Sequence, residues 1–200
     1  MMDLKRSESY PLRRRAVVSR LLDERGDMLV VAGLGACAWD VTAAGDDPLN
    51  FPLWGAMGGA AIMGLGLALA QPRRRVMVIT GDGDMLMGLG SLATIATKMP
   101  GNLTVVVLDN ERYGETGMQA THTAHDVDLA AVATGCGLTQ VSTIADDAAL
   151  EAALPSLRRG NGPIVSVIKV RAENLAFVLP PKDGAHLKDR FRTSLLGSAG

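Results

Sequence analysis

Two oxygen-bearing side chains, those of Asp82 and Asn110, each follow an apolar segment with the composition of a buried strand. The segment 76–80 leads into Asp82, and the segment 103–108 leads into Asn110. A helical pattern lies between them, so the stretch predicts a strand–turn–helix–strand unit with parallel strands. Residues that follow parallel strands meet at one edge of the sheet, where open α/β sheets bind ligands. A carboxylate and an amide oxygen at that edge suit Mg²⁺.

Glycines surround the first of these side chains. Gly81 and Gly83 flank Asp82 and precede the helical segment. Glycine lets the backbone approach a phosphate closely, and the N-terminus of the following helix favours an anion. The residue types and their spacing therefore predict a diphosphate that Mg²⁺ bridges to the protein.

The spacing resembles the cofactor-binding motif of the thiamine diphosphate enzymes. Gly81-Asp82-Gly83 is followed by 26 residues and then by Asn110, with a predicted strand at each end. The stretch GDGDMLMGLGSLATIATKMPGNLTVVVLDNERYGETGMQ is similar to sulfopyruvate decarboxylase beta subunits and phosphonopyruvate decarboxylases. The resemblance covers roughly residues 13–170. It implies thiamine diphosphate and Mg²⁺ as cofactors, with the metal held by Asp82, Asn110 and the backbone carbonyl of Arg112.

The same resemblance implies which residues contact the cofactor. The Gly55 carbonyl would accept a hydrogen bond from the 4′-amino group, and the Met57 side chain would hold the cofactor in a bent shape. Asp84 replaces a Ser of many relatives, and we expect its carboxylate to cap the following helix. The complete implied set is Gly35, Ala36, Gly55, Met57, Gly81, Gly83, Asp84, Met85, Asn110, Tyr113, Gly114 and Glu115.

A polar loop at 111–121 supplies the side chains that we expect near the substrate. An anionic substrate would be attracted by Arg112 or by a protonated histidine. Thr121 is also expected to reach the substrate. Such a loop is expected to order when the cofactor binds, which closes the site to water. The candidate catalytic residues are Thr116, Gln119, His122 and His125, and the sequence does not decide which histidine, if either, moves protons.

The composition fits a well-buried α/β domain. Of 200 residues, 48% are hydrophobic and 20% are charged, and a net charge of −1 gives no indication of nucleic-acid binding. Cys37 and Cys136 form neither a disulfide framework nor a metal motif, so we expect reduced thiols in the cytoplasm. The uncharged stretch 51–70 could span a membrane, but its glycines predict a buried helix instead. We expect the basic run 13–15 to be solvated.

Alternating strand and helix patterns predict a three-layer, doubly wound α/β fold, with a mostly parallel sheet and helices on both faces. Residues 1–11 are expected to be a flexible N-terminus, residues 12–170 the cofactor-binding domain, and residues 171–200 an extension that docks on a partner. The expected elements include a helix over 12–25, strands over 28–31, 137–141 and 163–170, a helix capped by Asp126, a helix that starts at Asp146 and is kinked or shortened by Pro155, and a short helix over 187–196.

The resemblance also implies a missing part. Enzymes of this family need a pyrimidine-binding domain whose Glu protonates the aminopyrimidine ring, and such a domain does not fit into 200 residues. We therefore expect a separate alpha chain, a cofactor at the interface, and an α2β2 or larger assembly. The predicted function is the beta subunit of a decarboxylase for a small anionic 2-oxoacid, with sulfopyruvate ranked before phosphonopyruvate.

Three alternatives stay open from the sequence. The first is an acetolactate-synthase-like carboligase subunit. The second is a 2-oxoacid:ferredoxin oxidoreductase beta subunit, which the lack of clustered cysteines disfavours. The third is a cofactor-binding or regulatory subunit without catalysis of its own.

Overall fold

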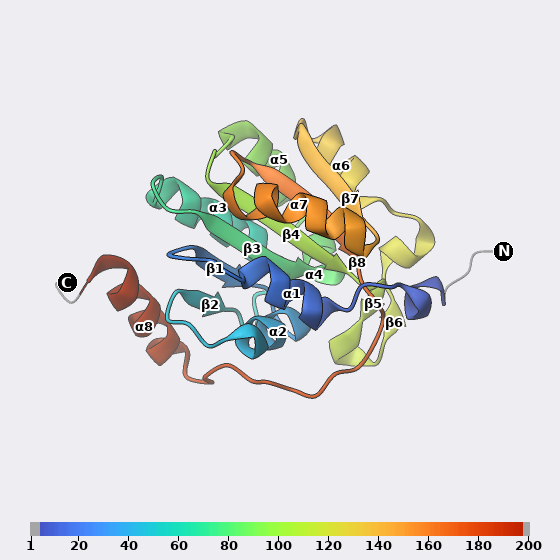
Figure 1. Ribbon diagram of the computed structural model, residues 1–200, viewed down its shortest axis with the longest axis horizontal. Helices are drawn as coiled ribbons and strands as arrows, with labels where there is room; N and C mark the ends of the chain where they lie inside the picture. The colour runs from blue at the N-terminus through green and yellow to red at the C-terminus, as the bar shows by residue number, and fades with distance from the viewer. Residues whose placement is uncertain (1–4, 198–200) are drawn as a thin grey trace.

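A six-stranded parallel sheet forms the centre of the protein (Figure 1). The computed structural model describes residues 5–197. The strand order is β2-β1-β3-β4-β8-β7, and every neighbouring pair is parallel. The strands are β1 (Leu29–Ala32), β2 (Asn50–Pro52), β3 (Val76–Gly81), β4 (Leu103–Asp109), β7 (Gln140–Ile144) and β8 (Ile164–Lys169). The predicted parallel α/β sheet is thus confirmed.

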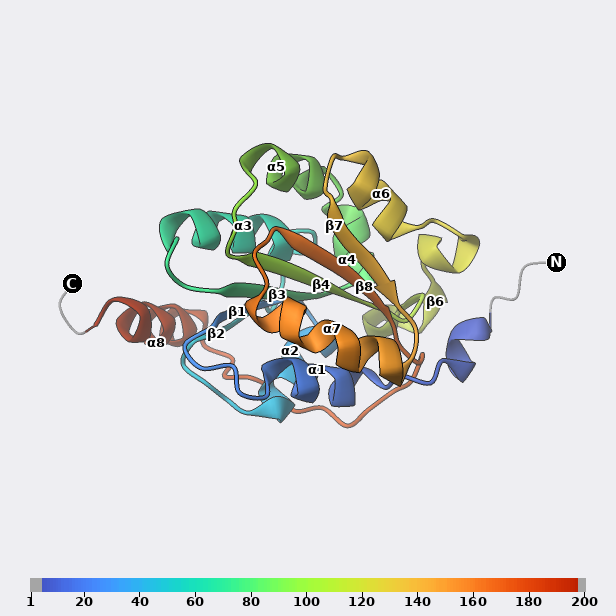
Figure 2. The same cartoon turned by 45° about the horizontal axis from the view of Figure 1, so that its top comes forward.

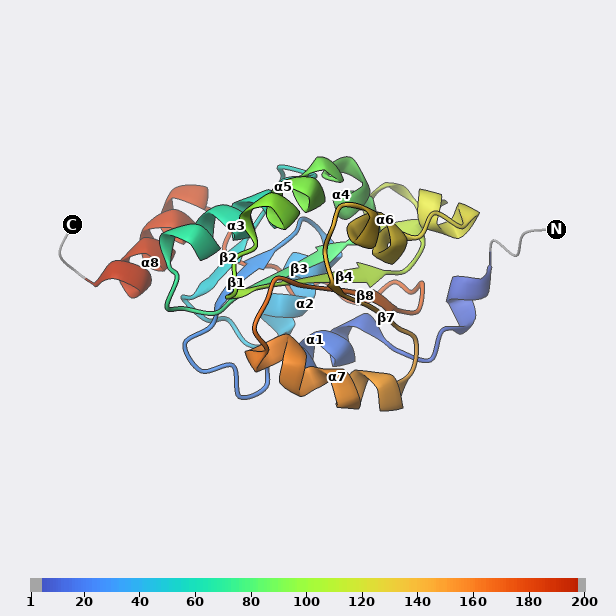
Figure 3. The same ribbon diagram turned by 90° about the horizontal axis from the view of Figure 1, so that it is seen from above.

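Helices cover both faces of this sheet (Figure 3). One face carries α1 (Arg14–Leu22), α2 (Ala36–Ala44) and α7 (Asp147–Arg159), and the other carries α3 (Ala60–Ala70), α5 (Gly90–Lys98) and α6 (Leu129–Gly135). Alternate residues of one strand serve the two cores: Met77 and Ile79 join the first, and Val76 and Val78 join the second. Side chains of a strand alternate between the two faces of the sheet, and here both faces are buried. Apolar residues therefore occupy positions on both faces, which explains why the strands appear in the sequence as continuous apolar runs.

The strand order reverses beside β1, and this reversal positions the site. The chain runs from β1 outward to β2 and then returns to β3 on the other side of β1. The turn that begins at Gly33 after β1 and the start of α4 after β3 therefore flank a topological switch point. The short helix α4 (Asp82–Met87) continues directly from β3, and Asp109 ends β4 beside it.

Smaller elements surround this edge of the sheet (Figure 2). A two-stranded hairpin joins β5 (Arg112–Tyr113) to β6 (Gln119–Ala120), with η2 (Gly114–Thr116) in its loop and η3 (His122–His125) after it. The C-terminal helix α8 (Gly184–Leu196) begins three residues before the predicted helix. It packs beside β2, where the Phe191 ring lies 5.3 Å from the Phe51 ring.

The stretch 51–70 differs from its prediction. Only residues 60–70 form a helix, because Phe51 and Pro52 belong to β2 and residues 53–59 form a turn. The helix does pack closely on the sheet, since a Cβ at Gly64 would collide with the side chain of Val78. Its outer face is not buried, as Ile62 and Leu69 are exposed. Within residues 5–197, no helix is long and apolar enough to cross a membrane.

Several predicted helix and strand boundaries are wrong. Asp126 does not cap α6: it adopts a left-handed conformation at the end of η3, and Asp128 accepts the capping hydrogen bonds instead. Helix α7 continues through Pro155 to Arg159, because Pro155 is exposed while the neighbouring leucines stay buried in the core. Strand β7 begins at Gln140, three residues later than predicted.

The N-terminal segment is tied to the domain. Residues 6–9 form η1, Arg6 Nε donates to Glu111 Oε1 at 3.0 Å, and the Tyr10 hydroxyl donates to the same oxygen at 2.7 Å. Glu111 is fully buried, so these contacts satisfy a carboxylate that water cannot reach. The prediction of a flexible N-terminus is therefore wrong for residues 6–10, and its first four residues lie outside the described part of the chain.

Candidate functional site

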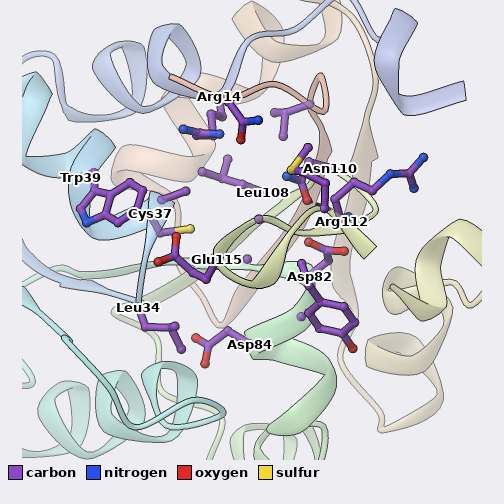
Figure 4. Close-up of a pocket in the computed structure, with 18 of the residues that line it drawn as sticks. Arg14, Leu34, Cys37, Trp39, Asp82, Asp84, Leu108, Asn110, Arg112 and Glu115 are labelled. Atoms are coloured by element: carbon purple, nitrogen blue, oxygen red, sulfur yellow. Dashed lines mark hydrogen bonds between the residues drawn. The ribbon is translucent and has the colours of Figure 1, made fainter. Parts of the chain in front are cut away.

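A cavity of about 360 Å³ lies at the carboxyl edge of the sheet (Figure 4). It is bounded by the turns after β1, β3 and β4, by the hairpin, and by the segment after β8. Most of the residues predicted to form a site line this one cavity: Ala36, Met57, Gly81, Asp82, Gly83, Asp84, Asn110, Arg112, Tyr113, Gly114, Glu115 and Thr116.

Some predicted residues do not line it. Met85 is packed in the core beneath α4, and Gly35 lies behind the Glu115 side chain. Gly55 is exposed in the turn before α3. Gln119 Nε2 donates to the Thr116 carbonyl at 2.9 Å and closes the hairpin loop. His122 and His125 are exposed on η3, so the structure does not bring the predicted histidines to the cavity.

Asp82 is a buried carboxylate with hydroxyl partners. Its Oδ2 accepts a hydrogen bond from Thr121 Oγ1 at 2.6 Å and lies 3.2 Å from Thr123 Oγ1. The residue is 2% exposed. Burial, together with the nearby Asp109 carboxylate, raises the pKa of Asp82 to about 7. Thr121 is equally buried, which contradicts the expectation that its side chain reaches the substrate.

The neighbouring carboxylate, Asp109, is held by a cation of the chain. Lys169 Nζ lies 2.7 Å from Asp109 Oδ2, and Thr123 Oγ1 lies 2.7 Å from Asp109 Oδ1. Next to it, Asn110 Oδ1 accepts a hydrogen bond from the Arg112 N–H at 3.0 Å. This bond orients the amide and leaves its oxygen a second lone pair.

The donor set fits a cation shared with a ligand better than a protein-only metal site. No three His, Cys, Asp or Glu side chains among residues 5–197 are grouped to hold a metal ion. The cavity instead offers one carboxylate, Asp82, and one amide, Asn110, from adjacent strand ends. Mg²⁺ prefers six oxygens and keeps several of them from phosphates and water, so two protein side chains suffice when a diphosphate is bound.

Asp84 has a different role from the predicted cap. Its carboxylate accepts hydrogen bonds from the Gly58 N–H and from the Thr80 hydroxyl, and it caps no helix. The first bond fastens the turn before α3 to α4, and the second fastens α4 to the end of β3. Gly83 lies beside that turn, since a Cβ there would come within 2.6 Å of the Tyr113 ring and 3.5 Å of Met57 Cε. Only glycine lets the Tyr113 ring pack this closely against α4.

The opposite wall of the cavity carries a paired charge network. Arg14 Nε and Arg15 Nε lie 2.6 and 2.8 Å from the two oxygens of Asp40, a residue with no solvent exposure. Arg13 pairs with Glu173. The expectation that the basic run 13–15 is solvated is therefore wrong: Arg14 is buried and lines the cavity.

The segment after β8 closes the cavity on that side. Glu173, Asn174, Leu175 and Phe177 line it, and the Phe177 ring lies 4.3 Å from the Trp39 ring. The Arg14 guanidinium donates to the Glu173 carbonyl at 2.9 Å, which fixes the segment over α1. Sequence reasoning missed these residues, because the segment has no regular structure and its partners lie about 160 positions away.

Glu115 lies against the turn after β1. A Cβ at Gly35 would come within 2.8 Å of the Glu115 carboxyl group, and Gly35 precedes α2 without a side-chain cap. Burial raises the pKa of Glu115, and the Arg14 charge opposes the shift. Among residues 5–197, no hydrogen bond or ion pair to this carboxylate is formed. An unpaired anion thus lies at the start of a helix, where a phosphate would also be favoured.

The fold and the cavity define an α/β domain with a ligand-sized cavity at a topological switch point. Residues 35–168 match the family described as "Thiamine pyrophosphate enzyme, C-terminal TPP binding domain". The chain belongs to this family.

The proteins similar to this chain include two decarboxylases and one solved structure. The sulfopyruvate decarboxylase subunit beta of Methanothermobacter thermautotrophicus is 38% identical over 187 residues, which cover 94% of this chain and 97% of that protein. The phosphonopyruvate decarboxylase of Streptomyces viridochromogenes is 38% identical over 94% of this chain, which spans 47% of that protein. A putative thiamin diphosphate-dependent enzyme from Mycobacterium smegmatis shares the fold, with a TM-score of 0.69 and 24% identity over 82% of this chain and 32% of that one.

Proposed function

We propose that the chain is the beta subunit of a thiamine diphosphate- and Mg²⁺-dependent 2-oxoacid decarboxylase. The observation that carries this proposal is that Asp82 and Asn110, which follow adjacent strands, line the same cavity. The similarity to a sulfopyruvate decarboxylase beta subunit along almost the whole of both chains supports it. The reaction converts sulfopyruvate and a proton into sulfoacetaldehyde and CO₂, or phosphonopyruvate and a proton into phosphonoacetaldehyde and CO₂.

The metal would be held by Asp82, by Asn110 and by the backbone carbonyl of Arg112. Charge supports the need for a cation, since four acidic side chains line the cavity and only two basic ones, Arg14 and Arg112, do. An anionic diphosphate is repelled by such a surface unless a divalent cation bridges the two.

The backbone around Gly81 and Gly83 would bind the diphosphate through N–H groups, assisted by the N-terminus of α2 after Gly35. Gly55 and Met57 would contact the aminopyrimidine and thiazolium rings. When bound, thiamine diphosphate supplies the electron sink that stabilises the carbanion left by decarboxylation. The chain orients this group and excludes water from one side of it.

The substrate half of the reaction would use residues of the hairpin and of η3. Thr116 lines the cavity, and Gln119 is hydrogen-bonded to it, so these two are the nearer candidates. His122 and His125 remain candidates only if the hairpin and η3 rearrange when the second chain binds. The carboxylate and sulfonate or phosphonate of the substrate would be attracted by Arg112.

A separate alpha chain would supply the pyrimidine-binding domain and its activating Glu, in an α2β2 or larger cytoplasmic assembly. The exposed side chains of Trp54 and Met57 support a contact there, because both lie in the turn that would hold the aminopyrimidine and Met57 lines the cavity. Apolar side chains exposed next to a polar site favour burial by a partner.

The test combines binding and turnover. Thiamine diphosphate and Mg²⁺ are titrated calorimetrically into this chain alone and into its mixture with the co-encoded neighbouring chain, and aldehyde and CO₂ are then measured with both 2-oxoacids. Binding and aldehyde formation by the mixture support the proposal. Carboligation without aldehyde would show a carboligase, and binding without turnover in any mixture would show a non-catalytic subunit.

A further inference from the structure

We propose that Thr121 and Thr123 are positioning residues that hold Asp82 as a single-oxygen ligand and so set the preference of the metal site for Mg²⁺ over Ca²⁺. This inference rests on the proposed function, because it assumes that Asp82 binds the cation of a metal–diphosphate. Neither threonine touches the cation: both act through the Asp82 carboxylate.

Both hydroxyls face one oxygen of Asp82, and Thr121 is the donor to it, because the single hydroxyl proton of Thr123 is directed at the nearer Asp109 oxygen. Thr121 Oγ1 lies 2.6 Å and Thr123 Oγ1 lies 3.2 Å from Oδ2, and the two hydroxyl oxygens lie 2.9 Å apart. Within residues 5–197, no side chain of another residue donates a hydrogen bond to Oδ1, and the further donor to the carboxylate is the backbone N–H of Asp82 itself. The side chains of other residues therefore hold one oxygen of the carboxylate and leave the other toward the cavity, to which Asp82 contributes.

The threonines are held in place themselves. Both residues are 1% exposed. The Thr121 N–H donates to the Glu111 carbonyl at 3.0 Å, and Arg6 Nη2 donates to the Thr123 carbonyl at 2.8 Å. Since Arg6 also pairs with the buried Glu111 carboxylate, the segment is fixed at both ends. Hydroxyls anchored in this way fix the rotation of the Asp82 side chain as well as satisfying it.

Thr123 also links the two carboxylates of the edge. Its hydroxyl lies 2.7 Å from Asp109 Oδ1, and Asp109 Oδ2 is paired with Lys169 at 2.7 Å. Asp109 thus has a partner for each oxygen and is not needed as a ligand. Of the two carboxylates, only Asp82 would then bind the cation, and it would do so through one oxygen.

One available oxygen is the geometry that Mg²⁺ requires. Mg²⁺ takes six oxygens at short distances in a near-regular octahedron, whereas Ca²⁺ accepts six to eight and often binds a carboxylate through both oxygens. If Oδ2 were released from the hydroxyls, Asp82 could turn and offer both oxygens. Removal of the hydroxyls should therefore weaken the Mg²⁺ complex more than the Ca²⁺ complex.

The experiment measures thiamine diphosphate binding to the complex of this chain with its partner, by calorimetry, with saturating Mg²⁺ or saturating Ca²⁺. We expect the Thr121→Val/Thr123→Val variant to lose about tenfold in the Mg²⁺-supported affinity and less with Ca²⁺, so that the preference narrows. The matched variant Thr121→Ser/Thr123→Ser keeps both hydroxyls and should keep the wild-type preference. Thr121→Val alone, which removes the 2.6 Å hydrogen bond to Asp82, replaces the double variant if that one fails to fold.

Each outcome decides the inference. A folded valine variant with the wild-type ratio of Mg²⁺ to Ca²⁺ affinities would overturn it and leave the proposed function intact, because a purely structural role lowers thermal stability without moving that ratio. Equal losses in the serine and valine variants would also overturn it. No binding of thiamine diphosphate by the wild-type complex with either cation would overturn the proposed function, and the inference with it.

Discussion

The two walls of the cavity differ in the partners that they provide for a buried carboxylate. On the α1 and α2 side, Asp40 has no solvent exposure and is bracketed by the guanidinium groups of Arg14 and Arg15. On the strand side, Asp82 is almost as buried, yet its partners are hydroxyls and its charged neighbour is another carboxylate, Asp109. The first wall is complete within the chain. On the second, the cation of the chain, Lys169, contacts Asp109 and not Asp82, so Asp82 is the carboxylate that we propose is kept for a ligand.

The largest effect is expected from breaking the complete wall. Arg14→Leu removes one of the two cations of Asp40 and the donor to the Glu173 carbonyl. We expect a loss of about 3 kcal/mol in the free energy of unfolding, because a buried carboxylate is left partly uncompensated. Urea denaturation measures it. Arg13→Leu is the control, since that side chain is largely exposed and its loss should cost less than about 1 kcal/mol; equal losses would refute the distinction.

The second prediction contrasts Asp82 with Asp84. Asp82→Asn should lower the Mg²⁺-supported affinity for thiamine diphosphate by about 100-fold or more, since the one ligand carboxylate is lost. It should also stabilise the metal-free protein at pH 8, because it removes a buried charge next to Asp109. Calorimetry and urea denaturation measure the two effects.

Asp84→Asn is the matched control for that pair of measurements. Its amide group cannot accept both hydrogen bonds that the carboxylate receives from Gly58 and Thr80, so stability should fall by about 1–3 kcal/mol. The two variants should therefore shift stability in opposite directions. If both variants shifted the free energy of unfolding in the same direction, the Asp82 carboxylate would be as well stabilised by its hydrogen bonds as that of Asp84.

The third prediction concerns pH. The pKa of Asp82 is raised to about 7 in the folded protein, above its ordinary value of about 4 in an unfolded chain. Between these values the folded state keeps a proton that the unfolded state has released, so the contribution of this group to stability falls as pH rises, by up to about 1.4 kcal/mol per unit. Urea midpoints measured from pH 5 to 8 should show this slope in wild type, and Asp82→Asn should lack it. Mg²⁺-supported binding should strengthen over the same range, with a proton released.

The smallest effect is expected at Glu115. Its carboxylate lies unpaired against Gly35, where the diphosphate is proposed to bind, and therefore opposes the anion. Glu115→Gln should tighten the binding of Mg²⁺–pyrophosphate by about threefold, which is a modest change in a solvated charge interaction. Glu151→Gln on α7 changes the net charge equally away from the cavity and should leave the affinity unchanged. Weaker binding by Glu115→Gln would mean that its carboxylate helps to hold the metal.

The fold could be predicted because its signals are local. Strands buried on both faces read as apolar runs, and turn residues separate them, so β3 and β4 were placed within a residue or two. Errors arose where tertiary packing decides. Pro155 is tolerated inside α7 because the buried leucines of that helix outweigh one lost backbone hydrogen bond, and Asp126 loses the capping position to Asp128, two residues later.

The candidate site was predictable only where its residues follow strands. Asp82 and Asn110 come to one cavity because parallel strands end at one edge. The contact of Asp84 with Gly58 and the pairing of Arg14 with Asp40 could not be predicted, since each pair is 26 positions apart and nothing in the intervening composition relates its members. The histidines were favoured because of their position in the chain, but η3 turns them outward.

The position of α8 has a consequence for how the protein meets other molecules. Strand β2 is three residues long, lies at the edge of the sheet, and is flanked by α8 through Phe51 and Phe191. An uncovered edge is a template on which foreign strands assemble, and this helix obstructs that route. A protein truncated before residue 184 would thus be prone to self-association and to fibrous aggregates, even if it still bound its cofactor. The helix therefore protects the protein against aggregation in addition to completing the fold.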